Sequence, residues 1–161
     1  EECLSHKGIQ ERLQKFFPKN GEYNIIYSGL YHVHQRVVET FRKGRVLLAG
    51  DAAHVNNPIG GLGMNGGIHD AISLCDFLAE VINGGDIELL DLYSRQRHKA
   101  QMDGVQATSI ANKKLMEAKD PVVRQQQLDE VRAAAQDPKK SRAYCLNAGM
   151  FTSLENAAAV T

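Results

Sequence analysis

Apolar residues at helical spacing open the chain. In the segment 8–17 the apolar positions recur every three or four residues, as at Ile9 and Leu13, which is the period of an amphipathic helix. Pro18 follows directly, and proline ends a helix because it cannot supply the backbone N–H that the next turn needs. The pattern therefore predicts a helix near the beginning of the chain.

Three extended runs follow this helix. The segments 23–31 and 32–41 are rich in Ile, Tyr and Val, residues that favour strands. After a turn, the segment 45–50 is short and almost wholly apolar, as are strands buried on both faces of a parallel sheet. Such a strand needs neighbouring strands and covering helices, and the chain offers few candidates. We therefore expect part of the fold to lie outside this chain.

Helical patterns fill most of the remaining sequence. The segment 68–82 is apolar nearly all round, which is typical of a helix buried in a larger body, and 87–115 has the pattern of one or two amphipathic helices. The Asp-Pro pairs at 120–121 and 137–138 each combine an N-cap residue with a first-turn proline and predict further helices. The tail 155–161 is expected to fray. The fold class is α/β, mostly helical after a short strand segment.

Composition narrows the class of protein. Nineteen basic and 19 acidic residues give a formal net charge of +0, so no overall field attracts nucleic acid or an anionic membrane. No apolar run has the length of a membrane span, and no signal-peptide pattern begins the chain. Cys3, Cys75 and Cys145 are widely spaced, which argues against a disulfide framework and a zinc site; Cys75 is expected in the core. We expect a cytoplasmic protein without a metal site.

The stretch 44–71 contains the candidate chemistry. A buried strand that ends in Gly50 and Asp51 places the Asp51 carboxylate at the carboxyl edge of a sheet, where ligands bind in open α/β folds. There the carboxylate can accept hydrogen bonds from a sugar-like hydroxyl, and Ala52 is small enough for a ligand to pass close by. The alternative is that Asp51 caps the turn 52–54.

A turn-rich loop and a helix start complete this stretch. Pro58 restricts the backbone of the loop, and the glycines after it free the backbone again. Gly63, Met64 and Asn65 then open the buried helix with unpaired N–H groups and the positive end of the helix dipole. An anion or an electron-rich carbonyl group fits in front of them.

A literal G-x-G-x-x-G runs from Gly61 to Gly66, and Asp86 follows about twenty residues later, as the dinucleotide-binding fingerprint requires. The context argues against that interpretation. The fingerprint follows its strand at once, whereas a long loop separates Gly50 from Gly61. Asp86 also lies in a turn rather than at the end of a second strand.

Several histidines are open to two interpretations. His54 is a candidate acid or base, or its ring makes a local hydrogen bond that holds the loop. His32 and His34 alternate on an expected strand, so both face one side. They line a substrate pocket, or they belong to a solvated face of the sheet; Tyr27 and Tyr31 leave the same choice.

The stretch 44–71 resembles the second FAD motif of the class A flavoprotein monooxygenases, the para-hydroxybenzoate hydroxylase and phenol hydroxylase group. The segments 33–38, 90–97 and 142–154 are also similar to parts of that family. The matching motif elements are Gly44-Arg45, Gly50-Asp51-Ala52-Ala53-His54, Pro58, Gly60, Gly63-Met64-Asn65 and Asp70-Ala71.

The resemblance implies the C-terminal part of a glutathione-reductase-like FAD-binding fold. Residues 1–43 would be a remnant of the sheet-containing substrate domain, and 44–161 the C-terminal part of the FAD-binding domain with terminal helices. The family's phosphate-binding strand-turn-helix, its acidic ribose-binding residue and its Asp-Gly motif would precede residue 1. Possible partners are that missing N-terminal part or a second copy of the chain.

The resemblance also assigns roles. The residue matching Asp51 binds the ribitol and ribose side of FAD, and the backbone at the helix start contacts the pyrimidine edge of the flavin. Pro58 would lie beside the reacting flavin carbon, which makes it the candidate catalytic residue. The implied cofactor-binding residues are Gly50, Asp51, Ala52, Gly63, Met64 and Asn65.

The implied reaction is hydroxylation of a small phenolic substrate with FAD, NAD(P)H and dioxygen. Two alternatives keep the flavin: a related FAD-dependent halogenase and a flavin-dependent reductase of isoprenoid chains. A third is a non-catalytic fragment that pairs with a partner chain through an exposed core helix.

Overall fold

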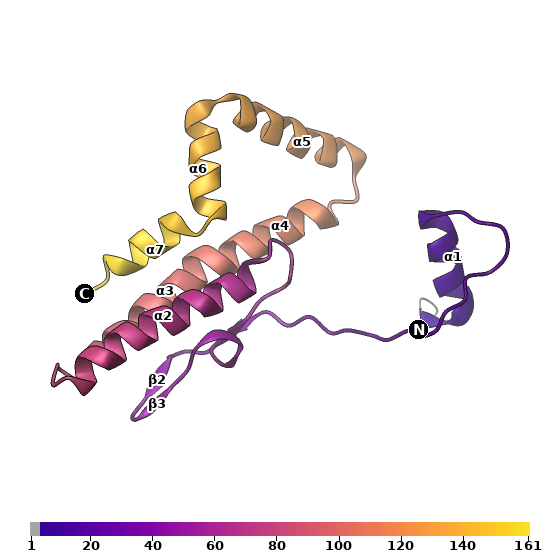
Figure 1. The fold of residues 1–161 in the computed structure, drawn as a ribbon. Helices are drawn as coiled ribbons and strands as arrows, with labels where there is room; N and C mark the ends of the chain where they lie inside the picture. Colours follow the sequence, from indigo (N-terminus) through magenta and orange to yellow (C-terminus); the bar gives the residue numbers. More distant parts are fainter. Residues whose placement is uncertain (1–3) are drawn as a thin grey trace. The chain divides into compact units, whose positions relative to one another are not determined.

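A computed structural model describes residues 4–161 (Figure 1). The chain divides into two compact units, with the boundary between Val33 and His34. In the described residues, the first unit contains an α-helix, and the second contains short strands followed by long helices. The two units are described separately below.

The first unit is built around helix α1 (His6–Phe16). Ser5 caps it by accepting a hydrogen bond from Gly8 N at 3.1 Å. The side chain of Gln10 bonds both backbone groups of Tyr23, donating to its carbonyl at 2.7 Å and accepting from its N–H at 2.9 Å. The helix predicted for 8–17 is confirmed.

The strand predicted for 23–31 is wrong, because this segment contains no strand and most of its side chains are exposed. Ile26 and Tyr27 are 92% and 87% exposed. Residues of high strand propensity form a strand only where another strand pairs with them, and no described residue of this unit does. His32, His34 and Tyr31 are likewise exposed and lie in no strand, so the predicted alternating sheet face is absent.

The second unit begins with two antiparallel ribbons. Strand β1 (Arg36–Val37) pairs with β4 (His54–Val55), and β2 (Arg42–Lys43) pairs with β3 (Val46–Leu47). Gly44, at φ +61°, turns β2 back into β3, a conformation that glycine adopts without strain.

The strand predicted for 45–50 therefore exists only at Val46–Leu47, and the parallel sheet predicted around it is not present in residues 4–161. Val46 is 60% exposed rather than buried on both faces. An apolar run of this length does not specify its partner, and here a hairpin supplies it.

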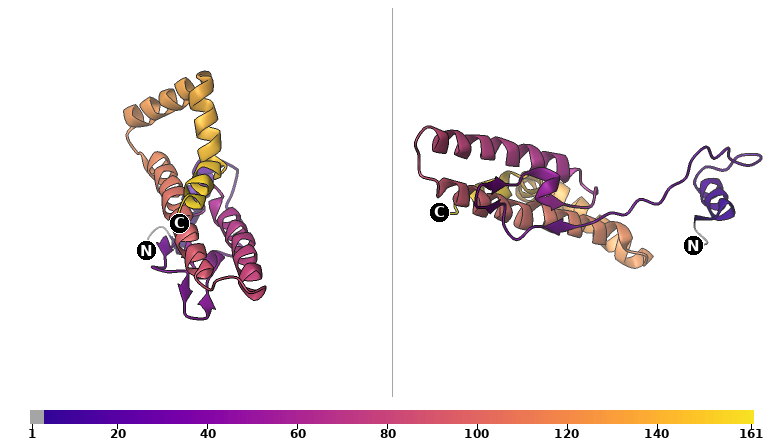
Figure 2. Two further views of the ribbon diagram at one scale, coloured as in Figure 1. Left: turned by 90° about the vertical axis from the view of Figure 1, so that its left-hand side faces the viewer. Right: turned by 90° about the horizontal axis from the view of Figure 1, so that it is seen from below.

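Long helices dominate the second unit. Helix α2 (Leu62–Ile82) packs beside α3 (Leu89–Ala100), which continues through a π-helical segment (Gln101–Gln106) into α4 (Ala107–Glu117). Figures 1 and 2 show α2 alongside the continuous α3–α4 rod. The helices predicted for 68–82 and 87–115 are confirmed, although α2 begins earlier than predicted.

Within residues 4–161, α2 is not covered on all sides; its expected burial in a larger body stays a prediction. One face contacts α3, but Ile68 and Ile72 are about half exposed, at 49% and 55%. Cys75, expected in the core, is also exposed. Helical spacing identifies the apolar residues of a helix, but it does not show which of them another element covers.

Three more helices follow, α5 (Pro121–Gln136), α6 (Pro138–Ala148) and α7 (Phe151–Ala158). Both predicted N-caps are confirmed: Asp120 accepts from Val122 N at 2.8 Å, and Asp137 accepts from Lys139 N at 2.9 Å. The prediction that residues 155–161 fray is wrong as far as Ala158, because α7 packs against α3 and the π-helical segment.

The core of the second unit joins the ribbons to the helices. Phe41, Ala53 and Tyr93 are buried together, and the rings of Phe41 and Tyr93 meet edge to face with centroids 6.5 Å apart. The Tyr93 hydroxyl donates to Leu48 O at 2.7 Å. Burial raises the pKa of Tyr93, the Asp70 carboxylate raises it further, and Arg97 offsets part of this rise.

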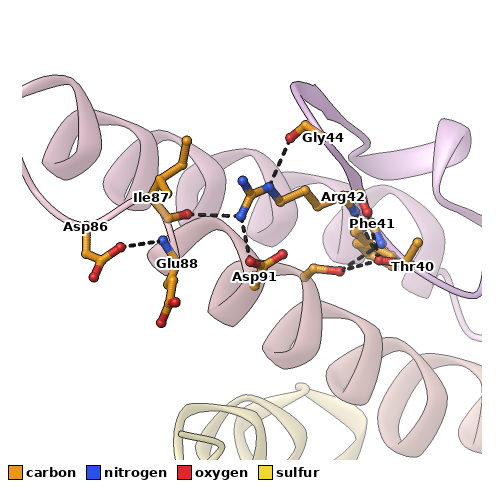
Figure 3. Close-up of polar contacts among 9 residues, drawn as sticks. Thr40, Phe41, Arg42, Gly44, Asp86, Ile87, Glu88 and Asp91 are labelled. Carbon is orange, nitrogen blue, oxygen red and sulfur yellow. Dashed lines mark hydrogen bonds and ion pairs between the residues drawn. The ribbon is translucent and has the colours of Figure 1, made fainter.

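Polar contacts fix the β2–β3 hairpin against α3 (Figure 3). The guanidinium of Arg42 donates to Ile87 O at 3.0 Å and to Asp91 Oδ2 at 2.7 Å. The hydroxyl of Ser94 accepts from Phe41 N at 2.9 Å. The hairpin is thus held against α3 and the turn before it at the start of its first strand.

Candidate functional site

The turn that contains Asp51 lies directly after the hairpin. Gly50, at φ +58°, starts a short 3-10 helix, η2 (Gly50–Ala52), and its carbonyl accepts from Ala53 N at 2.8 Å. The side chain of Asp51 is exposed and accepts no hydrogen bond from the residues that the structure describes. The carboxylate therefore does not cap the turn 52–54, and it is available to a ligand.

Two glycines bring this turn against α2. A Cβ atom added at Gly67 would lie 3.3 Å from the Cα of Gly50, a contact tighter than side chains normally make. The close approach of two backbones requires the absence of side chains. It holds η2, and Asp51 with it, next to the first turns of α2.

Asp70 is the central polar group beneath this turn. It is fully buried. Its Oδ2 accepts from Gly50 N at 2.9 Å and from His54 Nε2 at 2.6 Å. Its Oδ1 accepts from Arg97 Nε at 2.7 Å and from Gln101 Nε2 at 3.3 Å. One carboxylate thus connects η2, β4, α2, α3 and the π-helical segment.

The hydrogen bonds keep Asp70 ionised. Burial by itself raises the pKa of the carboxyl group, but hydrogen bonds from His54, Gly50 and Arg97, together with the charge of Arg97, outweigh burial and lower the pKa below its ordinary value. A buried carboxylate of this kind needs its cationic partner, because an unpaired buried charge is costly.

His54 is buried and contacts Asp70 and Phe41 rather than solvent. Its side chain is buried, its ring stacks on Phe41 with centroids 6.0 Å apart, and Nε2 bonds Asp70. Nδ1 is also buried and has no hydrogen-bond partner among the described residues. The geometry favours the second interpretation of His54: the ring holds the loop, through Asp70 instead of a local partner.

The start of α2 has the geometry expected for binding an anion or a carbonyl group. Gly61, at φ +66°, occupies the N-cap position and supplies no side-chain cap. The N–H groups of the first turn have no acceptor inside the helix, and Gly63, Met64 and Asn65 lie within or next to this turn. Met64 is 74% exposed, and Asn65 Nδ2 donates back to Gly61 O at 2.9 Å.

Pro58 is exposed on the loop between β4 and α2. The residue before it, Asn57, is buried and makes hydrogen bonds to residues from two other segments, Gln35 and Ser109. Sequence reasoning missed Asn57, Arg97 and Gln101. Asn57 directly before proline was the available signal, since such pairs favour turns.

The dinucleotide fingerprint is not realised by the G-x-G-x-x-G. Gly61 to Gly66 lie at the N-cap and first turns of α2, after a loop and not after a strand. Asp86 caps a turn by accepting from Glu88 N at 2.9 Å (Figure 3). Within residues 4–161, no group of His, Cys, Asp and Glu is arranged to hold a metal ion, and no helix is long and apolar enough to span a membrane.

Comparison with known proteins identifies the family. Residues 5–108 match the family described as FAD binding domain. The chain is 41% identical over 129 residues to para-nitrophenol 4-monooxygenase of Pseudomonas sp. (strain WBC-3), covering 75% of this chain and 32% of that protein. It is 43% identical over 101 residues to 6-hydroxy-3-succinoylpyridine 3-monooxygenase HspB of Pseudomonas putida (strain DSM 28022 / S16), covering 60% and 26%.

A solved structure agrees. The p-nitrophenol 4-monooxygenase of Pseudomonas putida DLL-E4 matches with a TM-score of 0.78 and 36% identity, over 93% of this chain and 40% of that one. The chain thus spans less than half the length of each of these relatives. The predicted resemblance and the predicted cofactor, FAD, are confirmed: the chain belongs to the FAD binding domain family found in flavin-dependent aromatic monooxygenases.

Proposed function

We propose that this chain forms the flavin-ring and ribitol side of the FAD site in a monooxygenase that hydroxylates a small phenolic substrate with NAD(P)H and dioxygen. The observation that carries the proposal is the exposed Asp51 carboxylate, free of partners among the described residues. Its turn packs against α2 at Gly67, in the second turn of a helix whose start has no side-chain cap. The p-nitrophenol 4-monooxygenases named above support the same reaction class.

The residues present fit FAD. Asp51 would accept hydrogen bonds from hydroxyls of the ribitol or ribose, and Gly50 and Ala52 leave the approach to it open. The first-turn N–H groups of α2, near Gly63, Met64 and Asn65, would face the electron-rich pyrimidine edge. Partial positive charge there stabilises negative charge on a ligand. FAD, when bound, supplies the redox chemistry that activates dioxygen.

Pro58 is the proposed catalytic residue, in the sense that it touches the reacting groups. It is exposed, it lacks an N–H, and a trans peptide bond precedes it. Its ring would form a rigid apolar wall beside the flavin and restrict the direction from which the aromatic substrate approaches. We assign it no proton transfer, because its side chain carries no titratable group.

The rest of the enzyme would complete the site. We propose that 1–43 belongs to the substrate domain and that 44–161 is the C-terminal part of the FAD-binding domain. The pyrophosphate of FAD would be held by a strand-turn-helix outside this chain or in a partner chain. A cytoplasmic location agrees with a reaction that consumes NAD(P)H.

The test uses the full-length protein that carries this chain. We expect bound flavin in its absorption spectrum and NAD(P)H oxidation that phenols stimulate and halide does not. Asp51→Asn keeps the shape but removes the charge, and it should weaken FAD binding about tenfold or more; Asp76→Asn, an exposed position on α2, is the control. Colourless protein would overturn the proposal, and stimulation by halide alone would indicate a halogenase.

A further inference from the structure

Both polar atoms of the Asn57 side chain make hydrogen bonds inside the protein. It is only 5% exposed. Nδ2 donates to Gln35 Oε1 at 3.1 Å and to Ser109 O at 3.2 Å. Oδ1 accepts from Ile59 N at 3.1 Å. An asparagine amide has two N–H donors and one oxygen, so this side chain is bound on all its polar groups.

The partners of Asn57 are themselves connected. Gln35 Nε2 donates to Ser109 Oγ at 3.0 Å, and that hydroxyl donates to Gln106 O at 3.1 Å. Gln106 Nε2 donates to Val55 O at 3.1 Å. We call Gln35, Asn57, Gln106 and Ser109 the amide clamp. Each bond in it has a defined donor and acceptor, so the orientation of each amide depends on its neighbours.

The amide clamp makes hydrogen bonds to the backbone both before and after Pro58. Val55 O is held before the proline, and the Asn57 side chain holds Ile59 N after it. Gly61 N donates to Pro58 O at 3.1 Å and closes the loop into a tight turn. The exposed proline ring thus lies on a short loop that hydrogen bonds connect to the start of α4.

We propose that Asn57 is a positioning residue that sets the place of Pro58 against the flavin and so controls how much of the oxidation reaches the substrate. This inference rests on the proposed function, because it needs Pro58 beside the flavin. Asn57 itself would contact neither substrate nor cofactor. Its effect is on the geometry of the reacting groups, where a small displacement is costly.

Two amide-to-acid substitutions test the positioning role of Asn57, because one should disrupt the amide clamp and the other should leave it nearly intact. Asn57→Asp replaces Nδ2 by an oxygen that faces two acceptors, Gln35 Oε1 and Ser109 O. Gln35→Glu introduces the same charge but keeps an acceptor opposite Asn57. The Ser109 hydroxyl can turn to donate to the new oxygen; it then gives up its bond to Gln106 O, but the bonds of Asn57 remain. In Asn57→Asp a flip of the Gln35 amide can restore one bond. In the double variant no flip can, since residue 35 then has no donor.

The first measurement is hydrogen exchange of Ile59 N–H and its neighbours in the full-length protein. We expect exchange about tenfold faster in Asn57→Asp, nearly unchanged exchange in Gln35→Glu, and in the double variant an acceleration beyond the product of the two. Equal effects of the two single variants, or simple additivity in the double variant, would overturn the amide clamp.

The second measurement is the fraction of NAD(P)H oxidation that yields hydroxylated phenol instead of hydrogen peroxide. It should fall severalfold in Asn57→Asp with FAD still bound, and remain near the wild-type value in Gln35→Glu and in the control Asn156→Asp, on the exposed side of α7. The positioning role would be overturned if Asn57→Asp accelerated hydrogen exchange but left the fraction of hydroxylated phenol unchanged, or if the variant lost FAD. Wild-type protein that hydroxylates no phenol would refute the proposed function, and the exchange data would still test the amide clamp.

Discussion

Replacing Asp70 by asparagine tests whether the buried carboxylate organises the candidate site. The side chain keeps its shape, but one of its two oxygens becomes an NH2 group. In the wild type, each carboxylate oxygen accepts from two donors. These are Gly50 N and His54 Nε2 on one side, and Arg97 Nε and Gln101 Nε2 on the other. Whichever way the amide turns, its NH2 group points at donors.

The size of the effect follows from Arg97. Its side chain is 4% exposed, and Asp70 is its ion-pair partner. Removing one partner of a buried pair costs about 3–5 kcal/mol, because the remaining charge stays buried without compensation. A domain is commonly stable by about 5–15 kcal/mol. Asp70→Asn is therefore expected to remove a large fraction of the free energy of unfolding of the second unit.

Urea unfolding followed by far-UV circular dichroism measures this loss. Asp76→Asn on the same helix is the control, since Asp76 is exposed, and it should change the free energy of unfolding by less than about 0.5 kcal/mol. Adding Arg97→Met to Asp70→Asn should restore part of the stability, because the uncompensated charge is then gone. If Asp70→Asn stayed within about 1 kcal/mol of wild type, the carboxylate would not be the central group described above.

Three further outcomes follow from the same contacts. Because the pKa of Asp70 is lowered in the folded state, its contribution to stability is present above the ordinary value of 3.8 and is lost as the pH falls below it; an acid titration of unfolding should show this loss, and Asp70→Asn should not. Gly67→Ala should cost about 1–3 kcal/mol in thermal or urea unfolding, since its Cβ would lie 3.3 Å from Gly50 Cα; a neutral effect would mean that the two backbones can separate. Tyr93→Phe removes the hydrogen bond to Leu48 O and should cost about 0.5–1.5 kcal/mol, with a larger loss expected only if Leu48 O stays buried and unpaired.

The helices could be predicted from the sequence because their signals are local. The caps at Asp120 and Asp137 and the spacing of apolar residues in α1 lie within a few residues of the structure they specify. The strands could not be predicted in this way. An apolar run such as 45–50 shows that a segment is extended, but its partner comes from elsewhere in the chain, and here only Val46–Leu47 pairs, in a hairpin.

The same distinction between local signals and distant partners applies to the candidate site. Local sequence was enough to place Met64 at a helix start. Asp51, which was predicted at the end of a buried strand, lies instead on the 3-10 turn after the hairpin. The donors that surround Asp70 come from positions 50, 54, 97 and 101, and no pattern within a short window links them. The partners of Asn57 were hidden for the same reason, since Gln35 and Ser109 lie far from it in the sequence.

The FAD motif mixes two kinds of residue that resemblance alone does not separate. Asp51, Pro58 and Met64 are exposed and have their side chains available to a ligand. His54 and Asp70 are buried and bond each other. Substitution of the exposed group should therefore change flavin affinity or the course of oxidation while the fold persists. Substitution of the buried pair should lower stability first, and flavin binding should fail only as a consequence. Measuring stability and flavin affinity on the same set of variants would separate the two groups, and a His54 variant that lost flavin at full stability would contradict this division.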